Sequence, residues 1–330
     1  MHLFFSLAAV LVLLILVFIG VDVVGWRYLF GVVIPIATII SFILGMLYRV
    51  IKWARSPVPF RIPTTCGQQK SLSWIKAGNL ESPHNIWGVL GRMVLEVLFF
   101  RSLFRNTKVS LKEGPRLVYG STKWLWLGGL VFHWSFLVIF VRHFKFFAEP
   151  VPAWVMALQN LDGFFQVGLP IIYLTDIAFL AALTFLLLRR LVDPKLRYIS
   201  LAADYFPLFL IIGIAVTGIL MRYFTKVDIV GIKEMAMGWL NLAPVVPAGI
   251  GTLFYMHLFL VCCLFIYFPF SKLLHMAGVF FSPTRNLANT NRVKRHVNPW
   301  DYSVKVHTYE EYEDEFRDVM KAAEMPLEKE

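Results

Sequence analysis

Four of the eight histidines in this sequence lie inside long apolar segments. Ionisable side chains are costly in such surroundings and usually have a functional partner. His133 and His143 stand ten residues apart in one segment, and His257 and His275 stand eighteen residues apart in another. Imidazole nitrogens bind haem iron and other transition metals, and imidazole also relays protons. The sequence therefore points to ligand or proton chemistry on these two segments.

Two antiparallel helices would bring the four histidines together in pairs of equal depth. His143 then faces His257 near the outer side, and His133 faces His275 near the inner side. A rise of about 1.5 Å per residue separates the first two positions by ~15 Å and the last two by ~27 Å. Helix tilt and a kink at Pro269 have to absorb this difference. Facing imidazoles are what bis-histidine ligation of haem b needs, so we predict two haems, an outer and an inner one.

Other chemistries for the same histidines remain open. A metal site built from histidines and carboxylates is disfavoured, because neither histidine-bearing segment contains Asp or Glu. The histidines could instead form hydrogen bonds in the core, or line the proton path of a transporter together with Asp176. Broken helices in matched halves would favour transport, but the sequences around Pro35 and Pro269 show no similarity to each other.

A carboxylate and several cations accompany the histidines. Asp176 is the only carboxylate well inside a predicted span, about nine residues, or ~14 Å, from its outer end. It could accept a proton when a quinol is oxidised, or it could be a structural carboxylate paired with Arg142, Thr175 or Tyr173. We take Asp176, Arg142 and Lys145 as the candidate quinol site. Haem propionates or simple snorkelling would account for the cations at the ends of the spans, which are Arg142, Lys145, Arg222, Arg189, Arg190 and Lys272.

Composition agrees with a membrane location for these segments. Of the 330 residues, 58% are apolar and only 16% are charged, against about 25% charged in a soluble domain. This excludes a disordered chain, a disulfide-rich secreted module and an ordinary cytosolic enzyme. A span needs about 20 apolar residues, so we expect an all-α bundle of six transmembrane helices. The expected spans are Leu3–Val21, Tyr28–Ile51, Trp124–Phe147, Val167–Leu188, Tyr205–Met221 and Gly251–Phe281.

The positive charges give the orientation. Twenty-six Lys and Arg residues fall on the side of the long loop after the second span, and six fall on the other side. Positively charged residues favour the cytoplasmic side, so both termini should be cytoplasmic. We therefore expect a multi-pass protein of the cytoplasmic (inner) membrane. Residues 86–104 are apolar but contain Arg92, Glu96 and Arg101, which predicts an amphipathic helix on that loop.

The chain ends in an acidic tail. Residues 301–330 hold 4 Lys/Arg against 10 Asp/Glu, after a basic segment at 285–296. Thr308 and Glu311 form a capping box for an amphipathic helix that we expect to dock on a soluble cytoplasmic subunit or to fold back on the inner loop. We divide the chain into two N-terminal spans (1–51), a cytoplasmic loop (52–121), a di-haem four-helix core (122–283) and a docking tail (284–330).

The cysteines offer no cluster site. Cys66 stands alone in a polar loop, and Cys262 and Cys263 are adjacent in an apolar run. Neither a disulfide framework nor an iron–sulfur site with four cysteines is available in this chain. A basic body with an acidic tail also makes nucleic acid a poor partner.

Two sequence stretches carry a family resemblance, VFHWSFLVIFVRHFKFF and MHLFLVCCLFIYFPFSKLLHMAGVF. Over about residues 124–283 they resemble the di-haem cytochrome b (gamma) subunits of respiratory nitrate reductases. The extra first span, the long loop and the tail FSPTRNLANTNRVKRHVNPWDYSVKVHTYEEYEDEFRD are more similar to DsrM, the membrane cytochrome b of the sulfite-reduction-associated DsrMKJOP complex.

This resemblance implies two haem b groups, the outer held by His143 and His257 and the inner by His133 and His275. Menaquinol would be oxidised near the outer haem, and electrons would pass to iron–sulfur centres in a cytoplasmic heterodisulfide-reductase-like subunit, DsrK. The chain would be an electron-transfer subunit that completes no reaction alone. The alternatives are the cytochrome b anchor of a heterodisulfide reductase and, in another class, a proton-coupled transporter.

Overall fold

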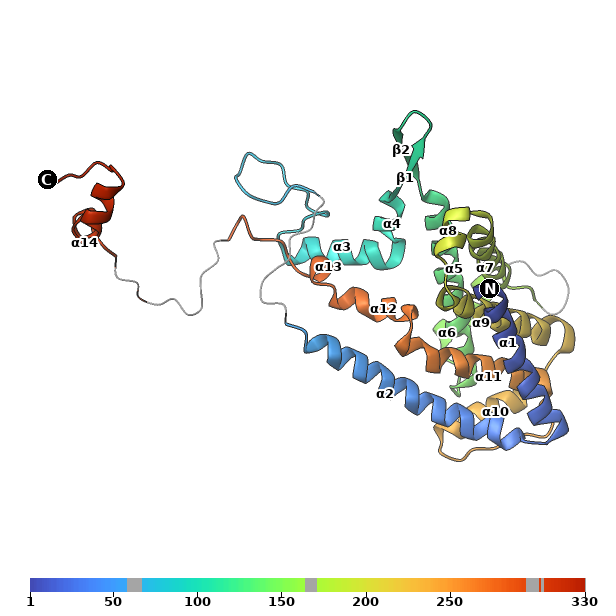
Figure 1. Ribbon diagram of the computed structural model, residues 1–330. Coiled ribbons are helices and arrows are strands. Elements are labelled where there is room, and N and C mark those ends of the chain that lie inside the picture. The colour runs from blue at the N-terminus through green and yellow to red at the C-terminus, as the bar shows by residue number, and fades with distance from the viewer. Residues whose placement is uncertain (58–66, 164–170, 295–302, 304–305, 330) are drawn as a thin grey trace.

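The protein is a bundle of long helices with a smaller group of helices and loops beside it (Figure 1). The structure is a computed structural model that describes residues 1–57, 67–163, 171–294, 303 and 306–329. Cys66 and the end of the basic segment at 295–296 lie outside these residues. The predicted all-α membrane bundle is confirmed, because apolar helices make up most of the fold.

Five helical stretches are long and apolar enough to cross a membrane. They match five of the six predicted spans. Each is an α-helix joined to a short π- or 3-10 turn: α1 with η1 (His2–Val23), η2 with α2 (Leu29–Ala54), α5 with η3 (Lys123–Phe146), α9 with η4 (Ala202–Thr225) and α11 with η5 (Thr252–Phe270).

The remaining predicted span, Val167–Leu188, corresponds to α7 (Leu174–Val192). Residues 167–170 lie outside the described part of the chain, residues 171–173 are not helical, and α7 begins at Leu174. Its 19 residues give a length of about 28 Å, close to the thickness of the hydrocarbon layer. Asp176 lies in its first turn, with Arg189 and Arg190 in its last turn. The expectation that Asp176 lies nine residues inside the span is therefore wrong. A carboxylate at this position is stabilised by the helix N-terminus.

The bundle is held together by two apolar clusters. α5 packs along α7 and α1 packs along α9, while α11 packs against α1, α2 and α9. One cluster surrounds Tyr255 and Met235, and the other surrounds Leu210 and Leu260. Large apolar side chains such as Phe4 also cover the outside of the helices, as expected for a surface in contact with lipid.

The last predicted span, residues 251–281, is not one continuous helix. α11 (Thr252–Tyr267) ends before Pro269, and two 3-10 turns, η5 (Phe268–Phe270) and η6 (Lys272–Leu274), follow it. Ser271 between these turns has an extended backbone. His275 then begins α12 (His275–Gly278), which continues into η7 (Val279–Phe281). The break arises where proline removes a backbone donor from the helix.

Residues 86–104 form two helices, α3 (Ile86–Phe99) and α4 (Arg101–Arg105). The predicted amphipathic helix is present but is interrupted at Phe100, whose φ of 50° is left-handed. Two indole groups of α5, those of Trp126 and Trp134, donate hydrogen bonds to the last carbonyls of α3 at 2.7 and 3.0 Å. These bonds dock the end of α3 on α5.

A short antiparallel hairpin follows α4, with strands β1 (Thr107–Lys112) and β2 (Arg116–Ser121). The sequence analysis did not predict it. Figure 1 shows the hairpin, α4 and the N-terminus at one end of the bundle, which we call the His133 end. α10 (Ile229–Leu240) lies at the opposite end, called the His143 end. The remaining short helices are α6 (Ala153–Asp162) and α8 (Pro194–Ile199).

The loop after α2 and the segment after α12 meet each other. Arg285 of α13 (Pro283–Asn286) pairs with Glu96 of α3 at 2.9 Å and donates to the Ser102 hydroxyl at 2.6 Å. Asn289 donates its backbone N–H to the Pro83 carbonyl at 2.6 Å. Two segments that are almost 200 residues apart in the chain thus form one platform beside α5.

The tail helix α14 (Tyr309–Ala322) has the predicted capping box. The Thr308 hydroxyl accepts from the Glu311 N–H, and the Glu311 carboxylate accepts from the Thr308 N–H. The Glu313 carboxylate is buried by the residues that follow the helix, because it accepts the N–H groups of Glu328 and Lys329.

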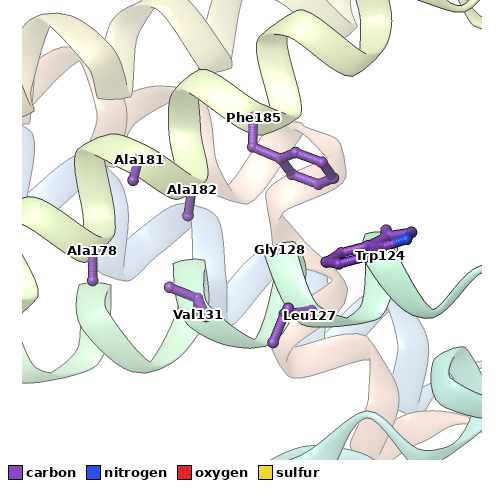
Figure 2. A pocket seen from close by; sticks show the side chains of 8 residues that line it. All are labelled: Trp124, Leu127, Gly128, Val131, Ala178, Ala181, Ala182 and Phe185. Atoms are coloured by element: carbon purple, nitrogen blue, oxygen red, sulfur yellow. The ribbon is translucent and has the colours of Figure 1, made fainter.

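The α5–α7 pair leaves an apolar recess of about 250 Å³ (Figure 2). Small residues on both helices line it together with two aromatic side chains, Trp124 and Phe185. Gly128 permits the contact, because a Cβ added there would lie 2.6 Å from the Phe185 ring. A Cβ on the neighbouring Gly129 would meet only Leu103, at 3.8 Å.

We expect Gly128→Ala to destabilise the bundle by about 1–2 kcal/mol, because the new methyl group on α5 would force the Phe185 ring of α7 out of its present position. The matched control is Gly129→Ala, which should be neutral or stabilising by up to about 1 kcal/mol, since alanine favours helix. Thermal unfolding of the detergent-solubilised protein measures both. Equal midpoints for the two variants would contradict the packing argument.

Candidate functional site

Two pairs of histidine rings face each other across the bundle. The rings of His143 and His257 have their centres 6.5 Å apart and their planes 9° apart. The rings of His133 and His275 have their centres 5.9 Å apart and their planes 84° apart. The structure thus places together the same pairs that depth-matching on antiparallel helices predicts.

These separations suit two imidazoles that share one metal ion. A bond from a metal to an imidazole nitrogen is about 2.0 Å long, and that nitrogen lies about 1.1 Å from its own ring centre, so rings on opposite sides have centres about 6.2 Å apart. Both observed values lie close to this distance.

All four rings use their Nδ1 atoms for hydrogen bonds inside the protein. Three of these bonds go to main-chain carbonyls, which only accept, so Nδ1 carries the proton in each case. The Nε2 atom then has a free lone pair, as a ligand nitrogen needs. The partners are Gly129 for His133 at 2.7 Å, Ile139 for His143 at 2.7 Å, Lys272 for His275 at 2.9 Å and the Thr217 hydroxyl for His257 at 2.9 Å.

The surroundings of the rings fit a flat aromatic cofactor. Phe100 and Phe132 each present an edge to His133 with ring centres 4.9 Å apart. Gly218 lies against His257, where a Cβ would come within 3.3 Å of the imidazole. Because the left-handed turn at Phe100 aims its ring at His133, the break between α3 and α4 belongs to this site.

The same histidines do not form a conventional metal site. In the described part of the chain, no three His, Cys, Asp or Glu side chains are grouped so that they could hold a metal ion. A porphyrin supplies four nitrogen ligands of its own, so two histidines complete the coordination of its iron. The donor set in each pair therefore fits haem better than a bare metal ion.

A buried charge cluster lies next to His143. Arg142, the preceding residue, is only 6% exposed and forms ion pairs with Asp176 and, at 3.2 Å, with Asp162. Asp176 also accepts a hydrogen bond from the Tyr223 hydroxyl at 2.8 Å. The Arg142 guanidinium stacks on the ring of Tyr173 at 3.8 Å. One cation and two carboxylates thus connect α5, α6, α7 and η4.

Two further cations of this region lack a carboxylate partner among the residues that the structure describes. Lys145 donates to the Gln159 side-chain oxygen at 3.1 Å. Arg222 donates to the Ile171 carbonyl at 3.1 Å and lies 4.0 Å above the Tyr173 ring, while its Nε has no hydrogen-bond partner. Both positive charges are therefore available to an anionic group.

The cations at the His133 end are engaged differently. Lys272 pairs with Asp204 at 2.8 Å, and Arg190 donates to the Ser200 hydroxyl at 3.0 Å. These contacts tie the ends of neighbouring helices together. Arg189 lies in the last turn of α7, where a positive charge favours the helix C-terminus.

Three residues of the site escaped the sequence analysis. Asp162 lies in a short helix between predicted spans, and Tyr223 lies in the π-turn η4, which no periodicity predicts. Thr217 could have been found, because it is the only Ser or Thr among residues 205–221. A single hydroxyl in an otherwise apolar span is a signal for a polar partner inside the bundle.

Fold and site together define a helical membrane protein with two facing histidine pairs. The chain belongs to the nitrate reductase gamma subunit family, whose model matches residues 84–296 and thus includes all four histidines. It is also similar to two proteins called "Hdr-like menaquinol oxidoreductase cytochrome b-like subunit". The protein from Archaeoglobus fulgidus is 44% identical over 83% of each chain, and that from Archaeoglobus profundus is 42% identical over 81% of each chain.

We expect Arg142→Gln to cost about 3–5 kcal/mol of stability, because it leaves Asp162 and Asp176 buried without their cation. Lys233→Gln is the control, since Lys233 pairs with an exposed carboxylate, Glu149, and such pairs contribute less than about 1 kcal/mol. Thermal unfolding compares the two. A small and equal loss in both variants would show that Arg142 does not hold the cluster together.

Proposed function

We propose that this protein is a di-haem b membrane subunit that accepts electrons from menaquinol and delivers them to a soluble iron–sulfur subunit. The observation that carries the proposal is the presence of two histidine pairs, each at the separation of imidazoles on one iron. A haem b held by each pair would supply a one-electron carrier near each end of the bundle. His143 and His257 would hold the outer haem, and His133 and His275 the inner one.

The relatives support the electron donor and the kind of partner. Their names describe a menaquinol oxidoreductase and a heterodisulfide-reductase-like complex. This agrees with the DsrMKJOP type of complex, in which the DsrK-like partner is heterodisulfide-reductase-like, and also with the anchor of a heterodisulfide reductase. We propose the former, in dissimilatory sulfur metabolism, because the tail and the long loop are part of that resemblance.

The charge cluster supports a quinol site at the His143 end. Asp176 and Arg142 satisfy each other's charge, so within the proposed site they hold the helices in position. Lys145 and Arg222 have charge to spare, and we assign them to the quinol oxygens or to a haem propionate. A proton from quinol would reach Asp176 through the Tyr223 hydroxyl, which already donates to this carboxylate.

The platform supports electron exit at the His133 end. α3, α4 and α13 gather there beside His133, and the positive charges of this loop predict a cytoplasmic location. The tail helix α14 presents partly exposed aromatic residues, Tyr309, Tyr312 and Phe316, on an otherwise acidic helix. We propose that this face docks on the soluble partner, with both chain termini in the cytoplasm.

A pyridine haemochrome assay of the purified protein should count two haem b per chain. His143→Ala and His133→Ala should each leave one haem, because each removes one ligand of a different pair. His307→Ala is the control and should retain both, since His307 lies outside the bundle beside Glu315.

Loss of both haems, or of neither, from either bundle variant would contradict the pairing. A wild-type protein without haem, expressed with adequate haem supply, would refute the cytochrome assignment and favour a proton path through the histidines.

The two haems should differ in their electron paramagnetic resonance. The angle between axial imidazole planes controls the g anisotropy of low-spin ferric haem, and perpendicular planes give the larger maximum g value. We expect the signal with the larger maximum g value to disappear in His133→Ala, whose ring pair is nearly perpendicular, and to persist in His143→Ala. The reverse assignment would contradict the ring geometry.

A further inference from the structure

Thr217 stands out among the groups that hold the histidine rings. His133, His143 and His275 each bond to a carbonyl three or four residues earlier in the chain. His257 instead bonds to another helix, α9, where the Thr217 hydroxyl lies 2.9 Å from its Nδ1 and the Ile214 carbonyl is a second partner. One of the four rings is therefore oriented in part by a side chain that a single substitution can remove.

The direction of this hydrogen bond follows from the other contacts of Thr217. Its hydroxyl donates to the Gly213 carbonyl at 2.7 Å and, in a longer contact, to the Ile214 carbonyl at 3.1 Å, so the hydroxyl oxygen is left to accept the Nδ1–H of His257. Thr217 is 5% exposed, so this bond lies in the interior of the bundle. Two successive hydrogen bonds, from His257 to Thr217 and from Thr217 to Gly213, thus connect the imidazole ring of α11 to a main-chain carbonyl of α9.

The neighbouring residues of α9 fit the same role. Gly218 leaves room for the imidazole, which a Cβ would approach to 3.3 Å. The π-turn η4 begins two residues later and carries Arg222 and Tyr223, which contact the charge cluster. π-turns inside helices often mark functional sites. α9 therefore contacts both the ligand ring and the proposed quinol site.

We infer that Thr217 is a positioning residue that sets the orientation and electron donation of His257 toward the iron that it would bind. This inference rests on the proposed haem function. An acceptor on Nδ1–H makes the imidazole a better electron donor, which favours the oxidised iron. A hydroxyl is a weaker acceptor than a carbonyl, so the Thr217 bond gives His257 less donation than His143 receives.

The test is a redox titration of Thr217→Val, Thr217→Ser and the wild-type protein. Valine keeps the shape of threonine but removes the acceptor, so we expect the midpoint potential of one haem to rise while the other is unchanged. Thr217→Ser should restore the wild-type value, because serine keeps the hydroxyl. The shifted haem should be the one that His143→Ala removes.

The matched control is Thr184→Val on α7. The Thr184 hydroxyl also donates to the carbonyl four residues earlier, at 2.8 Å, and among the described residues it forms no other side-chain hydrogen bond. We expect no shift of either potential in this variant. A shift equal to that of Thr217→Val would show a general effect of removing a helix hydroxyl and would overturn the inference.

The remaining outcomes are also decisive. Loss of one haem from Thr217→Val with retention in Thr217→Ser supports the inference, because the ring then needs its acceptor. Unchanged potentials in Thr217→Val, or the same change in both Thr217 variants, overturn it while the proposed function stands. Absence of haem from the wild-type protein overturns the proposed function itself and the inference that depends on it.

Discussion

An imidazole inside a lipid bilayer needs a partner for each polar nitrogen, and this requirement organises the site. An unsatisfied donor in hydrocarbon costs several kcal/mol, so each Nδ1–H must find an acceptor within the bundle. Three rings use the carbonyl of a preceding turn, which a helix supplies wherever a histidine is placed. With Nδ1 occupied in this way, Nε2 is the only nitrogen that can face a ligand.

The two ends of the bundle differ in how their charged side chains find partners. At the His143 end, the buried Arg142 pairs with Asp162 of α6 and Asp176 of α7, and Tyr223 of η4 donates to Asp176. At the His133 end, Lys272 is exposed and the charged groups of α3 and α13 bond across a surface platform. In the proposed function, the buried charge cluster lies at the quinol end and the surface platform at the end that meets the soluble partner.

Much of this arrangement could be predicted from the sequence, because it depends on apolar segments, capping residues and histidine spacings that are visible in the sequence itself. Five apolar segments became spans, the capping box at Thr308 began a helix, and depth-matching on antiparallel helices anticipated which rings meet. The late start of α7 was missed, although Gly168 and Pro170 precede it in the sequence and proline disfavours the interior of a helix. Asp162 and Tyr223 were missed because tertiary contact, not spacing, brings them to Asp176.

The break after α11 resolves a conflict that two straight helices would leave. Ten residues of helix turn His143 about 80° away from His133, whereas eighteen residues bring His275 back into phase with His257. Straight partners could therefore align one pair of rings but not both. α5 continues to Arg142, so the adjustment has to occur on the other chain segment. Pro269 ends the regular hydrogen bonding there, and His275 starts a separate helical turn whose ring can meet His133 from a different direction. The ring planes of this pair lie 84° apart, whereas those of His143 and His257 lie 9° apart, so the two pairs differ in ring orientation although their separations are similar.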